Sequence, residues 1–362
     1  MIVLGIETSC DETAAAIVED GRILHSNAVL SSMDLHAAYG GVIPEIAARE
    51  HIRSIHSVIE QALVTAFPSF QGWALERGWE KIDAIAVTYG AGLGGSLLVG
   101  VLTARTLAII KKKPLYAINH VEGHIYANFL TATNLPGYSL PASQPQFPLL
   151  ALIVSGGHSQ LALFKNHFDY KLLGQTQDDA IGEAFDKVAK ILGLPYPGGP
   201  SVGKKAMEGN SKAFDLPKAK MPSKYDFSFS GIKTAVLRRA QDMCGQDFTF
   251  PSHKLPESLS EAQKADIAAV FQRVAIETVV GKTVQAYEEF KPASVVIAGG
   301  VAASPELRRQ LSDKLLIKIY YTDPKLCTDN GAMVATLGCF KASLGQKPAD
   351  PYTLDIEPNL SM

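Results

Sequence analysis

The stretch Met1-Ile-Val-Leu-Gly-Ile-Glu-Thr-Ser-Cys-Asp-Glu-Thr-Ala-Ala-Ala-Ile-Val18 has a counterpart in Leu149-Leu-Ala-Leu-Ile-Val-Ser-Gly-Gly-His-Ser-Gln-Leu-Ala-Leu-Phe164. Each stretch is an apolar segment, a short turn and a second apolar segment, and this pattern predicts two strands that pair as a hairpin. The turns, residues 7–12 and 155–159, consist mostly of small and polar residues. Because the same hairpin occurs once in each half of the chain, we predict a duplicated fold.

A longer pattern also occurs twice. Its parts are a buried strand, a glycine turn, a helix, a second strand and a polar motif that enters another helix. The first copy comprises residues 82–88, a helix from about Ser96, residues 114–118 and residues 120–124; the second comprises residues 293–298, a helix from about Ser304, residues 316–322 and residues 327–331. Strands that alternate with helices predict an α/β protein, and two matching halves predict a cleft between them.

The boundary between the halves is expected just before Leu149. Residues 136–148 contain four prolines and few charges, which is typical of a linker. We therefore expect one domain of residues 1–148 and a second of residues 149–362, the second with a helical insertion. Within the second domain, the spacing of apolar residues from Ile267 to Ala275 predicts an amphipathic helix over residues 261–289.

Composition limits the class of protein. The chain has 362 residues, 47% hydrophobic and 19% charged, as in a soluble globular enzyme. The net charge of −2 excludes a globally basic nucleic-acid binder, but residues 203–240 carry nine Lys or Arg against three Asp or Glu. The longest apolar run, from Leu97, is interrupted by Arg105, so no membrane span is expected. Four scattered cysteines without a C-x-x-C pair indicate a reduced, cytoplasmic chain.

Two glycine-rich motifs resemble nucleotide-binding loops. Gly90-Ala-Gly-Leu-Gly-Gly95 matches G-x-G-x-x-G, but the next strand ends at Ile118 without the acid that would hold a ribose, so we reject NAD. Its glycines suit either an anion at a helix N-terminus or close packing. Gly198-Gly-Pro-Ser-Val-Gly-Lys204 matches most of a P-loop, but Lys205 stands where a hydroxyl is needed and a helical pattern precedes the motif.

His120 and His124 are the first candidates for metal ligands. Four residues apart, they share one face if the segment is helical. Asp329 occupies the corresponding place in the second half, and two His with one carboxylate leave open positions for a catalytic iron(II) or zinc ion. Asp329 could equally cap the last helix. Glu122 lies two residues after the first His, roughly 200° around a helix, so it should point away from the metal, unlike the acid of a zinc protease.

The two hairpin turns are candidates for a phosphate site, since they offer hydroxyls and free backbone N–H groups. Asp11 and Glu12 would repel a phosphate unless a metal or an amine lies between them. Ordinary hairpin turns would have the same composition. Gly299-Gly-Val-Ala-Ala303, after a buried strand, would let a flat base approach the backbone.

These motifs together resemble the universal tRNA N6-adenosine threonylcarbamoyltransferase family in its bacterial or organellar form. The resemblance spans almost the whole chain, and its joint pattern is highly specific. The matching stretches are residues 5–13, 41–47, 120–124, 154–158, 179–187, 197–200, 226–231 and 327–331.

The resemblance implies a duplicated actin-like, sugar-kinase-like fold with a nucleotide and metal cleft between the two halves. It implies that the protein moves the threonylcarbamoyl group of L-threonylcarbamoyladenylate to N6 of the adenosine at tRNA position 37, next to the anticodon. The products would be N6-threonylcarbamoyladenosine and AMP, and ATP is a further candidate for the nucleotide site.

Site residues also follow from the resemblance. It implies one divalent metal, Fe(II) or Zn(II), on His120, His124 and Asp329. The nucleotide and donor would contact Ile153, Val154, Ser155, Gly156, Gly157, Asp186, Gly199 and Ser304. Ser304 stands where bacterial relatives usually carry Asn. Asp11 or Glu12 is the candidate for the group that takes a proton from the attacking amine.

The partners implied are tRNA, a noncatalytic paralogue and a small P-loop ATPase, with a homodimer or a heterodimer both compatible. The basic run of residues 203–240 would contact tRNA phosphates. Three other classes stay open: a small-molecule kinase, which would not need the His pair; a metalloprotease, which the position of Glu122 opposes; and an ATP-binding regulator, which would hydrolyse ATP without tRNA.

Overall fold

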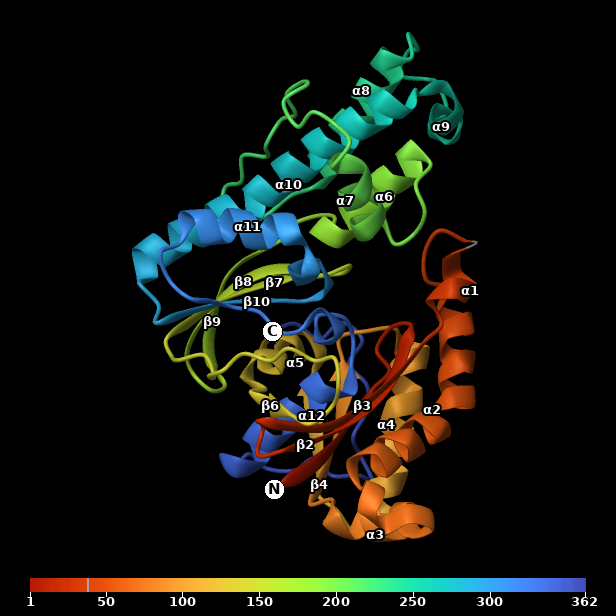
Figure 1. The fold of residues 1–362 in the computed structure, drawn as a ribbon, viewed down its shortest axis with the longest axis vertical. Helices are drawn as coiled ribbons and strands as arrows, with labels where there is room; N and C mark the ends of the chain where they lie inside the picture. Colours follow the sequence, from red (N-terminus) through yellow and green to blue (C-terminus); the bar gives the residue numbers. More distant parts are fainter. Residues whose placement is uncertain (38) are drawn as a thin grey trace. The chain divides into compact units, whose positions relative to one another are not determined.

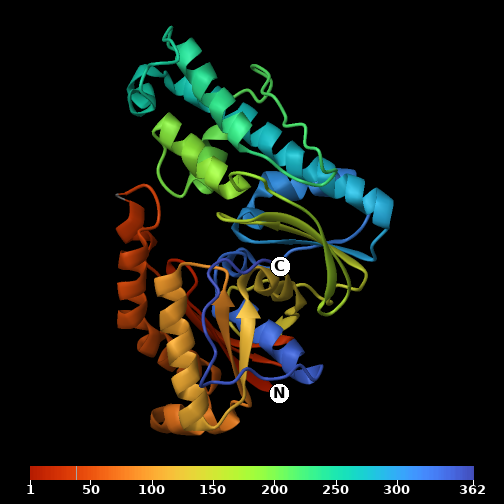
Figure 2. The same cartoon turned by 180° about the vertical axis from the view of Figure 1, so that it is seen from behind.

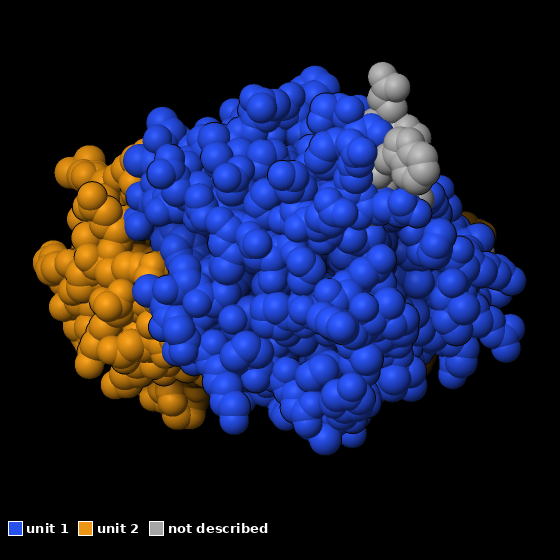
Figure 3. All heavy atoms as spheres, turned by 90° about the horizontal axis from the view of Figure 1, so that it is seen from below, with its two compact units in different colours: residues 1–145, 321–362 blue, residues 146–320 orange. Residues whose placement is uncertain are grey.

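The computed structural model of the protein describes residues 1–37 and 39–362. They divide into two compact units, which Figure 3 colours separately: unit 1 consists of Met1–Pro145 and Tyr321–Met362, and unit 2 consists of Gln146–Tyr320. The predicted boundary before Leu149 lies close to the point where the chain passes from unit 1 to unit 2, after Pro145. The predicted second domain, however, included residues 321–362, which the structure assigns to unit 1.

Unit 1 is built on a six-stranded mixed sheet in the order β5-β4-β1-β2-β3-β6 (Figure 1). The predicted N-terminal hairpin is present: β1 and β2 pair antiparallel, with Val3 opposite Val18. Strands β4 and β5 add in parallel on the other side of β1. The strands are β1 Ile2–Glu7, β2 Glu12–Glu19, β3 Ile23–Ser31, β4 Ala84–Gly90, β5 Leu115–Asn119 and β6 Ala132–Thr133.

Helices cover both faces of this sheet. The helices of unit 1 are α1 Met33–Ala37, α2 Pro44–Ala66, α3 Ala74–Lys81, α4 Gly94–Lys111, α5 His120–Tyr126 and α12 Gly331–Ser343, with 3-10 turns at Pro68–Trp73, Ala127–Phe129 and Pro324–Leu326. Leu4 and Ile6 of β1 pack in one apolar cluster with residues of α2 and α4. Since side chains alternate along a strand, Gly5 faces the opposite side, where α12 lies.

Helix α12 belongs to unit 1 because glycines let its backbone touch the sheet. A Cβ atom on Gly5 would lie 2.3 Å from the Ala335 nitrogen, and one on Gly331 would lie 2.5 Å from the Ala16 nitrogen. Residues 331–339 are all buried, so the helix lacks an amphipathic pattern. The sequence alone therefore did not indicate against which half it packs.

Helix α4 is long and apolar enough to cross a membrane by length and composition. One such helix is weak evidence of a span, because a core helix passes the same test. Leu97, Val101 and Ala104 of this helix are buried, and the helix packs against β4 and α2 in unit 1 (Figure 2). Arg105, which interrupts the apolar run, donates from Nε to the Pro351 carbonyl at 2.6 Å.

Unit 2 repeats the strand arrangement of unit 1 in the order β11-β10-β7-β8-β9. Strands β7 and β8 form the second predicted hairpin, and β10 and β11 follow in parallel on the far side of β7. The strands are β7 Leu149–Val154, β8 Ser159–Asn166, β9 Asp169–Gln175, β10 Ser294–Ala298 and β11 Ile319–Tyr320. The two sheets share the order of five strands, which confirms the predicted duplication.

The remaining helices lie in unit 2. They are α6 Ile181–Leu192, α7 Gly198–Ala206, α8 Ser230–Met243, α9 Leu255–Ser258, α10 Glu261–Phe290 and α11 Pro305–Lys314, with 3-10 turns at Ser252–Lys254 and Gly300–Ala303. The predicted long helix is α10, which starts at a capping box made by Ser260 and Gln263. The motif that resembled a P-loop forms the start of helix α7, which supports its rejection.

Candidate functional site

The two candidate histidines lie on α5, a helix that starts at a side-chain cap. The Asn119 oxygen accepts hydrogen bonds from the Val121 and Glu122 nitrogens at 2.9 and 3.3 Å. The rings of His120 and His124 project to the same side, with centroids 4.7 Å apart. Helical spacing thus brings the pair together as the sequence predicted.

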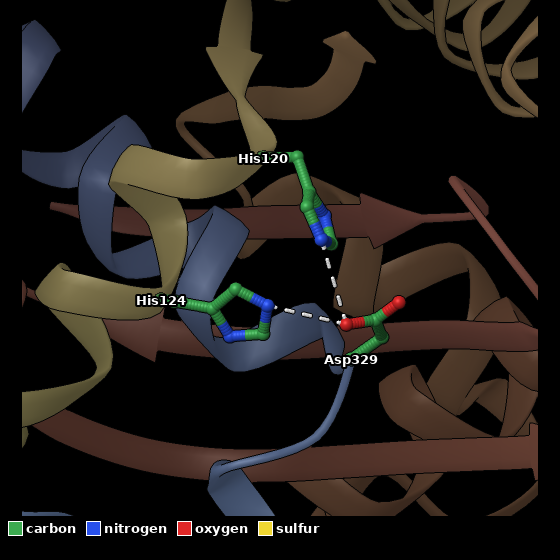
Figure 4. A group of neighbouring side chains, drawn as sticks. All are labelled: His120, His124 and Asp329. Atoms are coloured by element: carbon green, nitrogen blue, oxygen red, sulfur yellow. Dashed lines mark ion pairs between the residues drawn. The ribbon is translucent and has the colours of Figure 1, made fainter. Parts of the chain in front are cut away.

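Asp329 joins this pair from the loop before α12 (Figure 4). Its Oδ1 atom lies 3.6 Å from His120 Nε2 and 3.3 Å from His124 Nε2. The cap of α12 is the neighbouring Asn330, whose side chain accepts from the Met333 nitrogen at 3.0 Å. Asp329 is therefore not needed as a cap, and its carboxylate faces the histidines. The three ligand atoms lie within 4.8 Å of one another.

Residues of the first hairpin orient His120. Its Nδ1 atom lies 3.0 Å from Ser9 Oγ and 3.5 Å from Glu7 Oε2, so Nε2 is the nitrogen presented to Asp329. Glu7 is itself fixed by the Thr88 hydroxyl, which donates to it at 2.5 Å. Burial alone would lower the pKa of His120, but the carboxylates of Asp329 and Glu7 raise it to about 9. Metal-binding histidines usually have such a partner on the ring nitrogen that does not bind the metal, as Nδ1 of His120 has in Ser9 and Glu7.

The buried state of His124 fits a metal ligand. Among the residues that the structure describes, neither of its ring nitrogens has a hydrogen-bond partner, and the side chain is only 2% exposed. A buried imidazole that makes no hydrogen bond is unfavourable, even with the Asp329 carboxylate beside it. Coordination of a cation by Nε2 would satisfy one of its two nitrogens. Two histidines and one carboxylate suit Fe(II) and Zn(II) equally.

Glu122 is not part of this group, as its position in the sequence predicted. It is buried on α5, and its charge acts on Lys341 of α12, opposing the burial that lowers the pKa of that lysine. An acid in this place is not available to a water on the metal. The arrangement therefore differs from that of H-E-x-x-H proteases.

Glu12, the first residue of β2, lies next to Asp11 and close enough to Asp329 for their charges to act on it. Burial, followed by the negative charges of Asp329 and Asp11, raises the pKa of Glu12 to about 10. These surroundings favour the protonated form of Glu12. A divalent ion beside Asp329 would cancel part of the negative charge and favour loss of that proton.

The second hairpin turn lies at the start of α6 in unit 2. The side chains of Ile153 and Val154 are fully buried, so only their backbone is available to a ligand. The Ser155 carbonyl accepts from the Gly182 nitrogen at 3.2 Å. Gly156 and Gly157 are exposed, and a Cβ atom at either position would meet nothing within 4 Å. This turn has room for a ligand against its backbone.

The other residues predicted to bind nucleotide surround the same helix. Asp186, one turn further along α6, accepts a hydrogen bond from the Gly198 nitrogen at 2.6 Å, next to Gly199. Burial raises the pKa of Asp186. A Cβ atom on Gly299 would lie 2.5 Å from the Val154 carbonyl oxygen, so the glycine turn after β10 also touches the hairpin.

Ser304 has a structural role, at the point where the sequence predicted that a helix begins. It caps α11, its hydroxyl accepting from the Leu307 nitrogen at 3.4 Å. It follows the 3-10 turn Gly300–Ala303, which packs against α6. Ser304 thus lies next to the group around α6, with its side chain already engaged.

Other supporting residues were missed at the sequence level. Asn119 stands directly before the helix, where an N-cap is expected, so this signal was available in the sequence. Ser9 and Thr88 had no such signal, because their contacts with His120 and Glu7 join distant parts of the chain.

The fold and the site define a class: a duplicated α/β protein of the actin-like, sugar-kinase-like kind, with a His-His-Asp group in unit 1 that could hold a metal ion. The solved structure of HypF from T. kodakarensis supports the fold, with a TM-score of 0.57 at 13% identity, over 94% of this chain and 48% of that one.

Sequence comparisons identify the family. The model of the tRNA N6-adenosine threonylcarbamoyltransferase family matches residues 23–336. Proteins of that name are similar along their whole length: one from Thermomicrobium roseum is 48% identical, with 100% of this chain and 97% of that protein covered, and one from Desulfitobacterium hafniense is 46% identical, with 99% and 97% covered. This chain belongs to the tRNA N6-adenosine threonylcarbamoyltransferase family, which confirms the resemblance seen in its motifs.

Proposed function

We propose that this protein transfers the threonylcarbamoyl group of L-threonylcarbamoyladenylate to N6 of the adenosine at position 37 of tRNA. The observation that carries the proposal is the His120–His124–Asp329 centre, found in a chain whose relatives bear the name of this activity. The centre would hold one Fe(II) or Zn(II) ion. When bound, such an ion supplies Lewis-acid polarisation of a carbonyl group.

The reaction forms a bond between N6 and the carbamoyl carbon. The bond from that carbon to the adenylate phosphate oxygen breaks, and AMP leaves with the electron pair. The amine gives up one proton, and we assign its acceptance to Asp11, on the turn after β1, or to Glu12, the first residue of β2. Because the pKa of Glu12 is raised, its carboxyl group must first lose its own proton before it can accept the proton of the amine.

In unit 2, the nucleotide part of the donor is assigned to the residues around α6. Backbone N–H groups of Ser155, Gly156 and Gly157 suit the phosphate. Asp186 and Gly199 lie where α6 meets α7, and the glycine turn before Ser304 leaves room for a flat base. ATP would be accepted by the same groups.

The proposed partners are the tRNA substrate, a noncatalytic paralogue and a small P-loop ATPase, in the cytoplasm. We place the helper protein at exposed apolar side chains on α2 and α4, two helices that pack together. These side chains are Ile52 of α2 and Leu98, Leu102 and Ile110 of α4, which are 43–66% exposed. Surfaces of this kind mark protein contacts. The helper would make a heterodimer, and a second copy of this chain would make a homodimer.

The test is single-turnover transfer of labelled threonylcarbamoyl from its adenylate to unmodified tRNA, with the helper proteins present. We expect transfer by the wild type, loss with a chelator, and a drop of at least roughly 100-fold in H120A, since loss of a ligand exceeds loss of an outer-shell partner. H253A, which alters an exposed histidine in the 3-10 turn Ser252–Lys254 of unit 2, should transfer normally. Absence of transfer by the wild type, together with ATP hydrolysis without tRNA, would favour the ATP-binding regulator instead.

A further inference from the structure

A segment near the end of the chain, residues 349–361, crosses unit 1 and is referred to here as the strap. It begins where the Ala349 nitrogen donates to the Leu115 carbonyl of β5 at 2.8 Å. Arg105 of α4 then donates to the carbonyls of Pro351, Tyr352 and Leu354 at 2.6, 2.6 and 3.1 Å. Leu354 and Ile356 pack against the apolar core of unit 1. The strap is thus fixed to unit 1 along its length.

The strap continues over the glycine loop between β4 and α4. The Glu357 nitrogen donates to the Tyr89 carbonyl at 2.7 Å, and the Gly92 nitrogen donates to the Pro358 carbonyl at 3.1 Å. A Cβ atom on Gly90 would lie 2.1 Å from the Glu357 oxygen, so a larger residue there would displace the strap. In the loop that resembled a dinucleotide motif, Gly90 is therefore the glycine that the strap requires.

The strap reaches the metal helix through one side chain. Asn119 lies opposite Gly90 in the sheet. Its Nδ2 group donates to the Ser361 carbonyl at 3.1 Å, while its Oδ1 atom accepts from the first N–H groups of α5. The same buried amide thus holds the strap with one end and caps the helix of His120 and His124 with the other.

A second chain of contacts supports the first. The Leu93 nitrogen, next to the residue that holds Pro358, donates to the Ser9 carbonyl at 2.7 Å. The Ser9 hydroxyl in turn contacts Nδ1 of His120 at 3.0 Å. Both routes from the strap end at the first ligand of the proposed centre.

We propose that Asn119 is a positioning residue through which the strap fixes α5, so that the strap sets the affinity of the His120–His124–Asp329 centre for a divalent cation. The inference rests on the metal site of the proposed function. Its physical basis is the shortness of α5, which spans only His120–Tyr126. A helix of two turns is not stable by itself and depends on its cap and its packing. The two imidazoles meet one ion only while it is formed.

Two variants separate the strap from the cap. In N119D the carboxylate still accepts from the α5 N–H groups, but it has no donor for the Ser361 carbonyl. Deletion of residues 359–362 leaves Asn119 unchanged and removes that carbonyl. Each change is expected to weaken Zn2+ binding roughly 10- to 100-fold, the usual effect of losing an outer-shell contact. The matched control is S260A, which removes a helix cap in unit 2 and should leave Zn2+ affinity unchanged.

Two measurements decide the matter: Zn2+ affinity by competition with a chromophoric chelator, and hydrogen–deuterium exchange of residues 120–126 in the metal-free proteins. We expect weaker Zn2+ binding and faster exchange of α5 in both variants. If N119D and the deletion match the wild type in affinity and exchange, the coupling is refuted while the metal site stands. If the wild type binds no Zn2+ and no Fe2+, the metal site and this inference fall together.

Discussion

The buried imidazole of His51 contacts Cys10 and Thr13, the residues on either side of Asp11 and Glu12. Its Nε2 atom lies 3.0 Å from the Cys10 carbonyl, which can only accept, so Nε2 carries the proton. Nδ1 must then accept from the Thr13 hydroxyl, 2.8 Å away. Burial lowers the pKa of His51, which keeps the ring neutral.

This residue gives a prediction about stability and pH. The unfolded chain protonates His51 near its ordinary pKa of about 6.5, whereas the folded chain resists protonation. The contribution of the neutral His51 ring to the free energy of unfolding is therefore complete above about pH 6.5, and it is lost as the pH falls below that value. In H51Q we expect a smaller decrease in the free energy of unfolding between pH 7.5 and 5.5, measured with urea. H56Q, which alters an exposed histidine on the same helix, should retain the wild-type decrease; an H51Q curve parallel to the wild type would contradict the assignment.

At the scale of elements, the contact of α12 with the sheet depends on close packing. It places helix backbone directly on strand backbone, with Gly5 and Gly331 at the closest points. The atoms that an added Cβ would meet, the backbone nitrogens of Ala335 and Ala16, cannot move aside as a flexible side chain would. Because α12 follows Asp329 directly, a displaced α12 would also move that ligand.

We therefore expect G5A to destabilise the protein by about 1–3 kcal/mol, as overpacking of a core does, and to lower Zn2+ affinity. The matched control is G281A in the interior of α10, where an added Cβ would meet nothing within 4 Å. That change should stabilise the protein by about 0.5–1 kcal/mol. The free energies come from urea unfolding. Equal stabilities of G5A and the wild type would show that the strand and helix separate without cost.

At the scale of the whole molecule, ion pairs reduce the basic character of residues 203–240. Five of the nine basic residues there pair with acids, most of them outside the run: Lys205 with Glu208 and Glu261, Lys218 with Glu277, Lys224 with Glu289, Lys233 with Asp179, and Arg239 with Asp242. By contrast, Lys204, Lys212 and Lys220 are exposed and form no ion pair within the described part of the chain. These three are the better candidates for phosphate contacts.

The prediction concerns the salt dependence of tRNA binding. Replacing Lys204, Lys212 and Lys220 by Gln should lower the slope of log affinity against log salt by roughly one per lysine that contacts a phosphate. The control replaces the paired Lys205, Lys218 and Lys224 by Gln and should change the slope less. Filter binding at several salt concentrations measures both, and equal slopes in the two triple variants would argue against this assignment.

Much of the fold and part of the site were determined by the sequence alone. The two hairpins and the long helix α10 follow from the spacing of apolar residues between near neighbours, and so does the pairing of His120 with His124 on one helix face. These features depend on local geometry, which is the same wherever the segment is placed.

Tertiary structure decided what depends on distant residues. It joined α12 to unit 1, left the capping of that helix to Asn330, and placed Asp329 beside the histidines. It also put the strap against Asn119 and acids against the lysines of residues 203–240. Close packing and hydrogen bonding act between atoms that the fold brings together. Spacing along the chain does not predict which distant residues come into contact.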